Sequence, residues 1–145
     1  MIFKEKRIKV LHIVPSLSTT YGGPSKIAAD MGRALWGQGV NVEIATTDAD
    51  VNGNMAVLLD QCTDLQGVPV RYFHSPYGQK YGYSPDLIAW CRQNISAYDM
   101  VHFHAFFSHV MLATLICRRR HVPYIVRPIG QLDAWSYQRN PLRKT

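Results

Sequence analysis

Val10-Leu-His-Ile-Val-Pro15 and the loop after it, residues 16–25 with Tyr21-Gly-Gly-Pro24, decide the fold of this chain. The apolar stretch is short, as is typical of a strand buried on both faces of a parallel sheet. The two glycines allow a sharp turn and a close approach of a ligand to the backbone. Pro24 suits the first turn of a helix, where its missing N–H is not needed. We therefore predict a strand, a glycine loop and a helix N-terminus that can bind an anion, with a tight turn that binds nothing as the alternative.

The composition is that of a globular domain with a basic surface. The chain has 145 residues, which is enough for one domain with a hydrophobic core, and a formal net charge of +6. This charge favours an anionic partner such as a nucleotide, a phosphate group, nucleic acid or an acidic membrane. The three cysteines are far apart and odd in number, which favours a reducing cytoplasm over a disulfide framework. We find no signal-peptide pattern, and no apolar run of the roughly 20 residues that a transmembrane helix needs.

Apolar runs and turn signals indicate that strands alternate with helices along the chain. The first strand is expected at about residues 8–14, and the others at residues 40–46, 68–73, 99–103 and 123–127. Helices are expected after residue 23, from the N-cap motif Ser84-Pro85-Asp86, and over residues 106–120 and 132–138. Residues 47–67 are expected to form a long connection. This alternation predicts an α/β fold, a Rossmann-like parallel sheet with helices on both faces.

Three stretches that follow predicted strands are expected to meet at one edge of this sheet. In doubly wound sheets, ligands bind outside the carboxyl ends of the strands. The candidate ligand-binding residues at this edge are Gly22, Gly23, Arg127 and Gly130, and the candidate catalytic residue is His104. Arg127 has two interpretations, because it can meet an anionic ligand or form a structural ion pair with Asp133.

Two histidines in the fourth predicted strand suggest either a ligand contact or a metal site. His102 and His104 are two residues apart, so they point to the same face of the strand. His104 lies at the strand end, where it can reach a ligand, whereas His102 and His12 are expected in the interior. A metal site would combine His102 and His104 with His109, but no carboxylate occurs between residues 100 and 132 to orient these ligands. We therefore expect no metal, and a histidine-based metal hydrolase is the less favoured alternative.

The basic residues in the last part of the sequence also have two interpretations. Residues 118–120, with Arg139, Arg143 and Lys144, form either a solvated surface or a contact with anionic lipid, where polybasic segments gain about 1 kcal/mol per charge. No nucleic-acid recognition motif accompanies them, so nucleic acid is not an expected partner. Peripheral contact with an anionic membrane is therefore a candidate interaction.

Five segments resemble the beginning of retaining glycosyltransferases of family four, which have the two-domain GT-B fold. They are LHIVPS at residues 11–16, GGP at 22–24, LWGQGVNVEI at 35–44, YDMVHFH at 98–104 and VPYIVRPIGQLDAW at 122–135. The resemblance implies that residues 1–145 are the N-terminal, acceptor-side half, and that the C-terminal nucleotide-sugar-binding domain is absent from this chain. It also places Gly22 and Gly23 near the donor diphosphate and His104 near the transferred sugar. At residue 129 the chain has isoleucine, where many members of the family have the histidine of a Pro-His-Gly motif.

The function that this resemblance implies is transfer of a hexose from a nucleotide-sugar donor to a glycan or lipid-linked acceptor, as in polysaccharide biosynthesis. The expected partners are these two substrates and the C-terminal domain, and no cofactor is expected. Residues 1–145 alone are expected to be inactive, because half a cleft cannot exclude water from the reaction. The expected location is the cytoplasm, with the inner face of the membrane as a candidate contact. The residues by themselves leave open a non-enzymatic nucleotide- or phosphate-binding α/β module.

Overall fold

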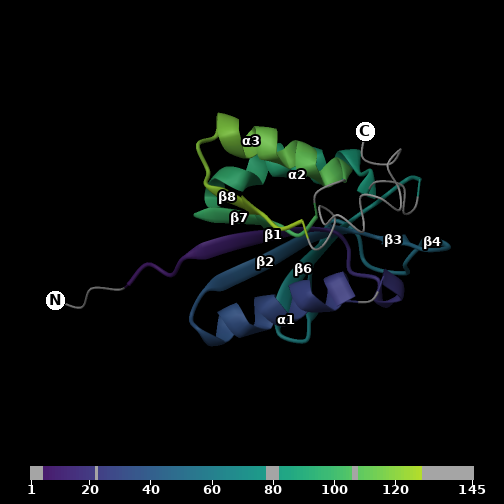
Figure 1. Ribbon diagram of the computed structural model, residues 1–145, viewed down its shortest axis with the longest axis horizontal. Coiled ribbons are helices and arrows are strands. Elements are labelled where there is room, and N and C mark those ends of the chain that lie inside the picture. The colour runs from purple at the N-terminus through teal and green to yellow at the C-terminus, as the bar shows by residue number, and fades with distance from the viewer. Residues whose placement is uncertain (1–4, 22, 78–81, 106–107, 129–145) are drawn as a thin grey trace.

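The computed structural model describes residues 5–21, 23–77, 82–105 and 108–128, and its centre is a six-stranded sheet (Figure 1). The strands lie side by side in the order β5-β6-β2-β1-β7-β8. The five parallel strands are β1 (Lys9–Ser16), β2 (Asn41–Thr47), β6 (Val68–Phe73), β7 (Met100–Phe103) and β8 (Tyr124–Val126). The strand β5 (Cys62–Leu65) pairs with β6 in the antiparallel direction and forms one edge of the sheet.

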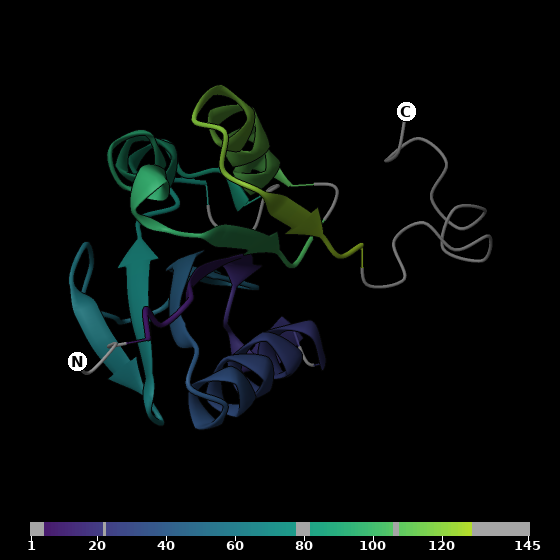
Figure 2. The same cartoon turned by 90° about the vertical axis from the view of Figure 1, so that its left-hand side faces the viewer.

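Helices cover both faces of this sheet and make three layers. The helix α1 (Gly23–Gly37) lies on one face, and α2 (Pro85–Asn94) and α3 (Ala113–Arg119) lie on the other (Figure 2). The remaining elements are a hairpin of β3 (Ala49–Asp50) and β4 (Gly53–Asn54) and the 3-10 turns η1 (Thr19–Tyr21), η3 (Ile95–Ala97) and η4 (His109–Leu112). The α/β architecture predicted from the alternation of strands and helices is confirmed.

One part of the predicted topology is wrong. Residues 47–67 were expected to form a long connection, with a turn of helix or a short strand at residues 55–59, but they contain the β3–β4 hairpin and the antiparallel edge strand β5. The side chains of β5 are exposed or half-buried, so this strand lacks the apolar run that marks the central strands. The predicted helix over residues 106–120 is described from His109, first as η4 and then as α3. The helix predicted over residues 132–138 lies outside the described residues.

Alternation along β1 divides the hydrophobic core into two parts. Leu11 and Ile13 point to one face and pack with buried residues of α2 and α3, whereas Val14 packs with Ile44 of β2 beneath α1. His12 points to the same face as Val14 and is fully buried, as the sequence predicts. The first strand is therefore the centre of the core and also carries a buried polar group.

The predicted N-cap of α2 fixes that helix to the end of β6. The Ser84 hydroxyl accepts a hydrogen bond from the Leu87 N–H (3.3 Å) and donates one to the His74 carbonyl (2.8 Å). Ser84 itself is fully buried. One hydroxyl thus accepts from a backbone N–H that has no partner within the helix, and it also donates to a backbone carbonyl just after β6.

Replacing Ser84 by alanine should lower the free energy of unfolding by about 1–2 kcal/mol, because both hydrogen bonds are lost from a buried position. Urea denaturation of the Ser84→Ala variant at pH 7 measures this loss. The control is Ser96→Ala, at an exposed position in η3, which should stay within about 0.5 kcal/mol of the wild type. Equal losses in the two variants would contradict the capping role.

Candidate functional site

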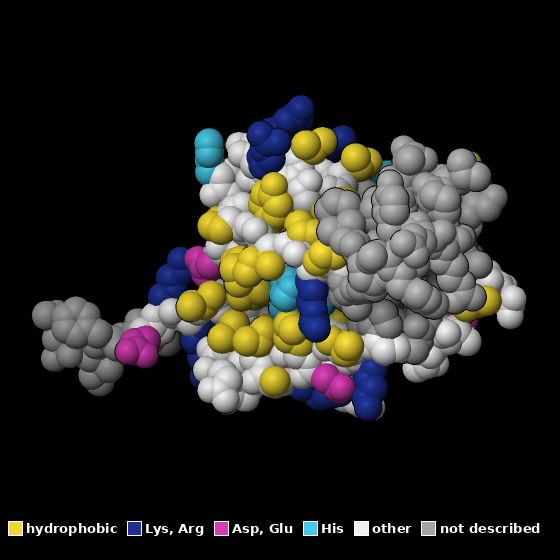
Figure 3. All heavy atoms as spheres, viewed as in Figure 1, with side chains coloured by type: hydrophobic (Ala, Val, Ile, Leu, Met, Phe, Trp, Pro, Cys, Tyr) yellow, Lys and Arg dark blue, Asp and Glu magenta, His cyan; other side chains and the backbone are white. Residues whose placement is uncertain are grey.

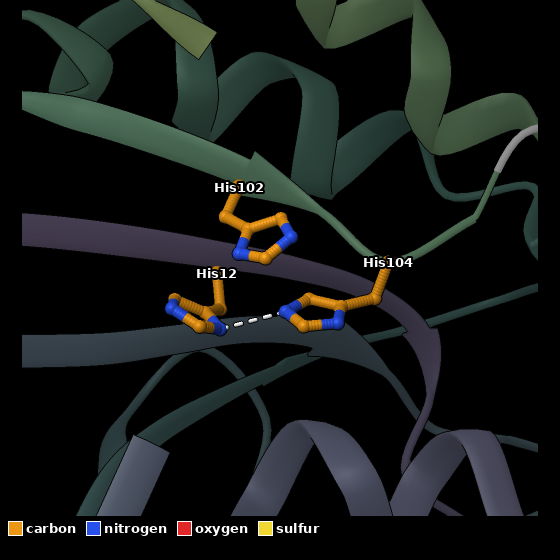
Figure 4. Close-up of side chains that lie close together, drawn as sticks. All are labelled: His12, His102 and His104. Atoms are coloured by element: carbon orange, nitrogen blue, oxygen red, sulfur yellow. Dashed lines mark hydrogen bonds between the residues drawn. The ribbon is translucent and has the colours of Figure 1, made fainter. Parts of the chain in front are cut away.

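Three histidines, from the middle of β1 and the carboxyl end of β7, meet where these two strands pair (Figure 4). His12 of β1 lies beside His102 of β7 in the parallel register, and His104 comes one residue after the end of β7. The backbone N–H of His104 donates to the Ile13 carbonyl (3.0 Å), which continues the pairing of the two strands. The three rings point to the side of the sheet that α1 covers (Figure 4). The pairing of β1 with β7 therefore builds the cluster.

The imidazole rings are in direct contact. The ring centroids lie 4.2 Å apart for His102 and His104, 4.7 Å for His12 and His104, and 5.0 Å for His12 and His102. A hydrogen bond of 2.7 Å joins Nε2 of His104 to Nδ1 of His12. This geometry confirms that His102 and His104 share a face, and it adds His12, which sequence reasoning assigned only to the core. The sequence signal for His12 was available, because the first and fourth strands of a doubly wound sheet are neighbours.

His104, just after β7, is more deeply buried than His102 of β7, although the sequence predicts His102 as the interior residue. His104 is only 2% exposed, whereas His102 is half-buried. His104 was expected to reach a ligand and His102 to be interior. The reason is the position of His104 beyond the last β7 residue, where its ring stacks on both other imidazoles instead of turning outward.

Burial keeps all three imidazoles neutral at pH 7. It lowers the pKa of His12 from 6.5 to about 4, with a smaller effect from His102. Burial, with smaller effects of His12, His102 and Arg127, lowers the pKa of His104 to about 3. The pKa of His102 is lowered by burial and by Arg127. Because these pKa values lie below those of the unfolded chain, their contribution to stability is complete above pH 6.5 and is lost as the pH falls.

Arg127 completes the candidate site. It follows β8, where its backbone N–H donates to the Phe103 carbonyl (2.8 Å), and its charge acts on His102 and His104. Arg127 thus lies near His104, at the edge of the sheet where the sequence places both residues, while the alternative partner of Arg127, Asp133, lies outside the described residues. Figure 3 shows histidine and basic side chains side by side on this face, with hydrophobic side chains around them.

Three buried nitrogen atoms at this site have no hydrogen-bond partner among the described residues. They are Nε2 of His12, Nδ1 of His104 and Nη1 of Arg127. An unsatisfied buried polar atom costs about 1–3 kcal/mol, so native structures keep such atoms mainly where something else binds them. The site therefore has hydrogen-bonding capacity to offer to a ligand.

The histidine cluster also has the composition of a metal site. His12, His102 and His104 each offer a ring nitrogen within 4.8 Å of the others, and no other such group occurs in the described part of the chain. The less favoured metal alternative combined His102 and His104 with His109, but His109 packs on Tyr83 and accepts from the Ser84 N–H instead. The positive charge of Arg127 opposes a cation, and no described carboxylate orients the rings. The site thus suits an oxygen acceptor or an anion better than a metal ion.

The glycine loop forms the neighbouring part of the same edge. Gly23 is the first residue of α1, and a side chain at this position would meet nothing within 4 Å. The loop before it is held in place, because the Ser16 hydroxyl donates to the Ala49 carbonyl (2.6 Å) and the Ser18 hydroxyl donates to Asp50 (2.6 Å). The space beside Gly23 is open, so the packing of the described residues does not require glycine at this position. The predicted site residues Gly22 and Gly130 lie outside the described residues.

Comparison with known proteins agrees with this fold. Residues 22–145 match the family model described as "Glycosyl transferase 4-like domain". A solved structure, the "Crystal structure of Anabaena Alr3699/HepE in complex with UDP and glucose", is similar with a TM-score of 0.54 and 19% sequence identity. The match covers 83% of this chain and 29% of that chain. No significant match is found among curated proteins.

These findings bear on the family and on the fold. At 19% identity the structural likeness shows the fold alone, and the chain spans less than a third of the length of that protein. The family model, in contrast, covers most of the chain, from the glycine loop onward. The chain therefore belongs to the glycosyltransferase 4-like domain family and has the Rossmann-like fold of an N-terminal GT-B glycosyltransferase domain.

Proposed function

We propose that this domain is the acceptor-side half of a retaining glycosyltransferase that transfers a hexose from a nucleotide-sugar donor to a glycan or lipid-linked acceptor. The family assignment supports transfer in general, and the similar HepE structure contains UDP and glucose. The observation that carries the proposal is a pair of buried nitrogen atoms without a described partner, Nδ1 of His104 and Nη1 of Arg127, at one edge of the sheet beside the N-terminus of α1. A process such as polysaccharide biosynthesis would use this reaction.

The chemistry needs a stabilised leaving group, a positioned acceptor hydroxyl and a dry cleft. In our proposal the backbone at Gly22 and Gly23 and the Arg127 guanidinium face the donor diphosphate, where helix dipole and charge favour an anion. His104 contacts the transferred sugar in this proposal, and Gly130 is proposed as a further donor- or acceptor-binding residue. Protein groups supply the positive charge, so we propose neither a cofactor nor a metal. A C-terminal domain would grip the nucleotide and close the cleft, and residues 1–145 alone would be inactive.

The best-supported alternative is a module that binds a nucleotide or phosphate without catalysis. It would use the same edge of the sheet and the same donors, so geometry does not separate it from the transferase. Turnover does separate the two, because only the transferase releases nucleotide from a nucleotide sugar when an acceptor is present. A histidine-based metal hydrolase is less favoured, because Arg127 places a positive charge beside the imidazoles.

Replacing Gly23 by valine should lower transfer by the full-length enzyme about 100-fold, because the side chain blocks the approach of the diphosphate to the backbone. The matched control is Gly37→Val at the other end of α1, where a side chain also meets nothing within 4 Å. Nucleotide release measures turnover, and circular dichroism checks the fold. Wild-type turnover in Gly23→Val would show that the loop is only a turn, and binding of UDP without turnover by the wild type would favour the binding module.

Replacing His104 by alanine should lower kcat about 100-fold while changing KM less, because the contact tightens as charge develops on the sugar ring. His121→Ala, at an exposed position after α3, is the control and should behave as the wild type. Unchanged turnover in a folded His104→Ala variant would remove this residue from the site. Equal losses in His102→Ala, with loss of bound zinc, would favour the metal hydrolase.

We also propose that the domain works on the cytoplasmic side of a membrane and contacts it through α3. Leu112 and Leu115 are 48% and 50% exposed, and Arg119 follows them at helical spacing, so one face presents apolar and basic side chains together. Beside them is a cavity of about 800 Å³ with a mainly hydrophobic lining that includes Tyr77, Tyr83 and Met111. Figure 3 shows basic and hydrophobic side chains gathered over α3. None of the described helices is long and apolar enough to cross a bilayer.

Reversing the charge of Arg119 should weaken binding to acidic vesicles more than tenfold, since each basic residue near such a surface contributes about 1 kcal/mol. Sedimentation with phosphatidylglycerol–phosphatidylcholine vesicles compares Arg119→Glu with Lys26→Glu, an equal charge change on α1 at the opposite face of the sheet. The Lys26→Glu variant should bind as the wild type does. Equal effects of the two variants, or no binding by the wild type, would contradict a specific contact through α3.

A further inference from the structure

The hairpin of β3 and β4 lies at the end of the sheet where α1 begins, and the proposed reaction gives it no part (Figure 1). Its residue Asp50 is a half-buried carboxylate that contacts the hydroxyls of Ser18 and Thr20, in the loop before α1. We infer that Asp50 is a positioning residue, which fixes this loop in one conformation and thereby raises its affinity for the diphosphate of the donor. The fixed conformation follows from the geometry, and its use in donor binding rests on the proposed function.

Asp50 is a common acceptor for two hydroxyl groups that are also close to each other. Its Oδ1 accepts from the Ser18 hydroxyl (2.6 Å) and from the Thr20 hydroxyl, and these two hydroxyl oxygens lie within hydrogen-bond distance of one another. Each hydroxyl has a single hydrogen atom to donate. Without the carboxylate, one hydroxyl would donate to the other and the second hydrogen would have no acceptor in this group. With the carboxylate, both hydroxyls donate to Asp50 and keep their lone pairs free.

Those lone pairs hold the backbone of the loop. The Ser18 hydroxyl accepts from the Thr20 N–H (3.3 Å), and the Ser16 hydroxyl accepts from the Ser18 N–H (3.0 Å). The two hydroxyl groups and a backbone N–H lower the pKa of Asp50, so the carboxylate is charged at pH 7 and its hydrogen bonds are charge-assisted. A hydroxyl that donates to a carboxylate is polarised and becomes a better acceptor. The charge of Asp50 therefore strengthens the bonds that order the loop.

The hairpin that carries Asp50 is itself anchored on the sheet. Asp48, just before the hairpin, is buried, and its carboxylate accepts from the Ser75 N–H after β6 (2.7 Å) and from the Asn54 amide of β4 (2.8 Å). These anchors use neither of the two loop hydroxyls. Asp50 is therefore held from the side of β2 and β6, independently of the loop that it positions.

The same loop is joined to the start of α1. Ser25, in the first turn, is buried, and its hydroxyl donates to the Ser16 carbonyl (3.0 Å). The Ser16 hydroxyl in turn donates to the Ala49 carbonyl of β3 (2.6 Å). Thr19 of the loop and Gly23 of α1 contribute to the lining of one cavity of about 560 Å³. The hairpin thus orders the chain next to the helix N-terminus, where an anion is favoured.

A fixed loop binds its ligand more tightly than a loop that samples several conformations. The observed dissociation constant is the intrinsic one divided by the fraction of molecules in the binding conformation. Losing the carboxylate should lower this fraction and raise Kd. A residue that only stabilises the fold has a different effect, because its loss reduces the number of folded binding sites and leaves the Kd of each folded site unchanged.

Hydrogen exchange measures the order of the loop without any ligand. In the full chain at pH 7, the backbone N–H groups of Ser18 and Thr20 should exchange at least tenfold faster in Asp50→Ala than in the wild type. The matched control is Asp99→Ala, which removes a carboxylate that accepts from the Lys9 N–H (2.9 Å) at the opposite end of β1. Unchanged exchange in a folded Asp50→Ala variant, or an equal increase in Asp99→Ala, would overturn the inference.

Thr20→Val tests the same contact from the loop, because it removes one hydroxyl from an exposed position and keeps the size of the side chain. Alone it should speed exchange at Ser18 about threefold. Added to Asp50→Ala it should contribute less than twofold, since the hydroxyl has already lost its acceptor. Multiplicative effects of the two substitutions would overturn the inference. If Asp50→Ala does not fold, Thr20→Val decides alone, and unchanged exchange at Ser18 overturns the inference.

Binding of pyrophosphate, measured by calorimetry on the full-length enzyme, tests the part that rests on the proposed function. Asp50→Ala should raise Kd about tenfold with an unchanged number of sites, and Asp99→Ala should change neither. If exchange increases as expected but Kd is unchanged, or the wild type does not bind pyrophosphate, the positioning of the loop stands and its proposed place at the diphosphate fails. If exchange is unchanged, the inference fails and the proposed function is unaffected.

Discussion

The parallel pairing of β1 with β7 is the constraint on which the candidate site depends. It places His12 beside His102, and the hydrogen bond from His104 to Ile13 continues the same pairing beyond the end of β7. The alternation of side chains then puts all three imidazoles on the face that α1 covers, while Leu11 and Ile13 fill the opposite core. One strand pair thus supplies both the centre of the hydrophobic core and the polar cluster. A shift of one residue in this register would place the histidine side chains on the opposite face of the sheet, among the apolar residues beneath α2 and α3.

Much of the fold could be predicted from local sequence patterns, because the strands and helices that these patterns favour are the ones that form in the folded protein. Val68–Phe73 is apolar and bounded by turns, and Ser84-Pro85-Asp86 is a helix start whose cap hydrogen bond forms as expected. The strand β5 could not be predicted in this way. Its four residues do not form an apolar run, and pairing with β6 gives them extended structure. Antiparallel edge strands of this kind are common additions to otherwise parallel sheets, but their own sequence does not identify them.

The sequence predicted where in the fold the candidate site lies better than it predicted the burial and contacts of each residue. Strand order placed His104 and Arg127 at one edge, and the structure brings them together. The deeper burial of His104 than of His102 could not be predicted, because it depends on ring stacking beyond the strand end, which no periodicity encodes. His12 was assigned to the core correctly, but its bond to His104 depends on two segments that are 92 residues apart. Such contacts follow from topology, and the topology must be known before they can be found.

The charge balance of the site narrows what it can bind. The histidine cluster combines neutral imidazoles with a guanidinium that has an unused donor, next to the N-terminus of a helix, and no described carboxylate is paired with Arg127. A positive charge that is half-buried without a counter-charge is unfavourable in the free protein. A ligand that brings negative charge removes this penalty, whereas a metal ion would increase it. The low pKa values of the histidines have the same consequence, since the rings stay neutral and leave Arg127 as the charge that an anion meets.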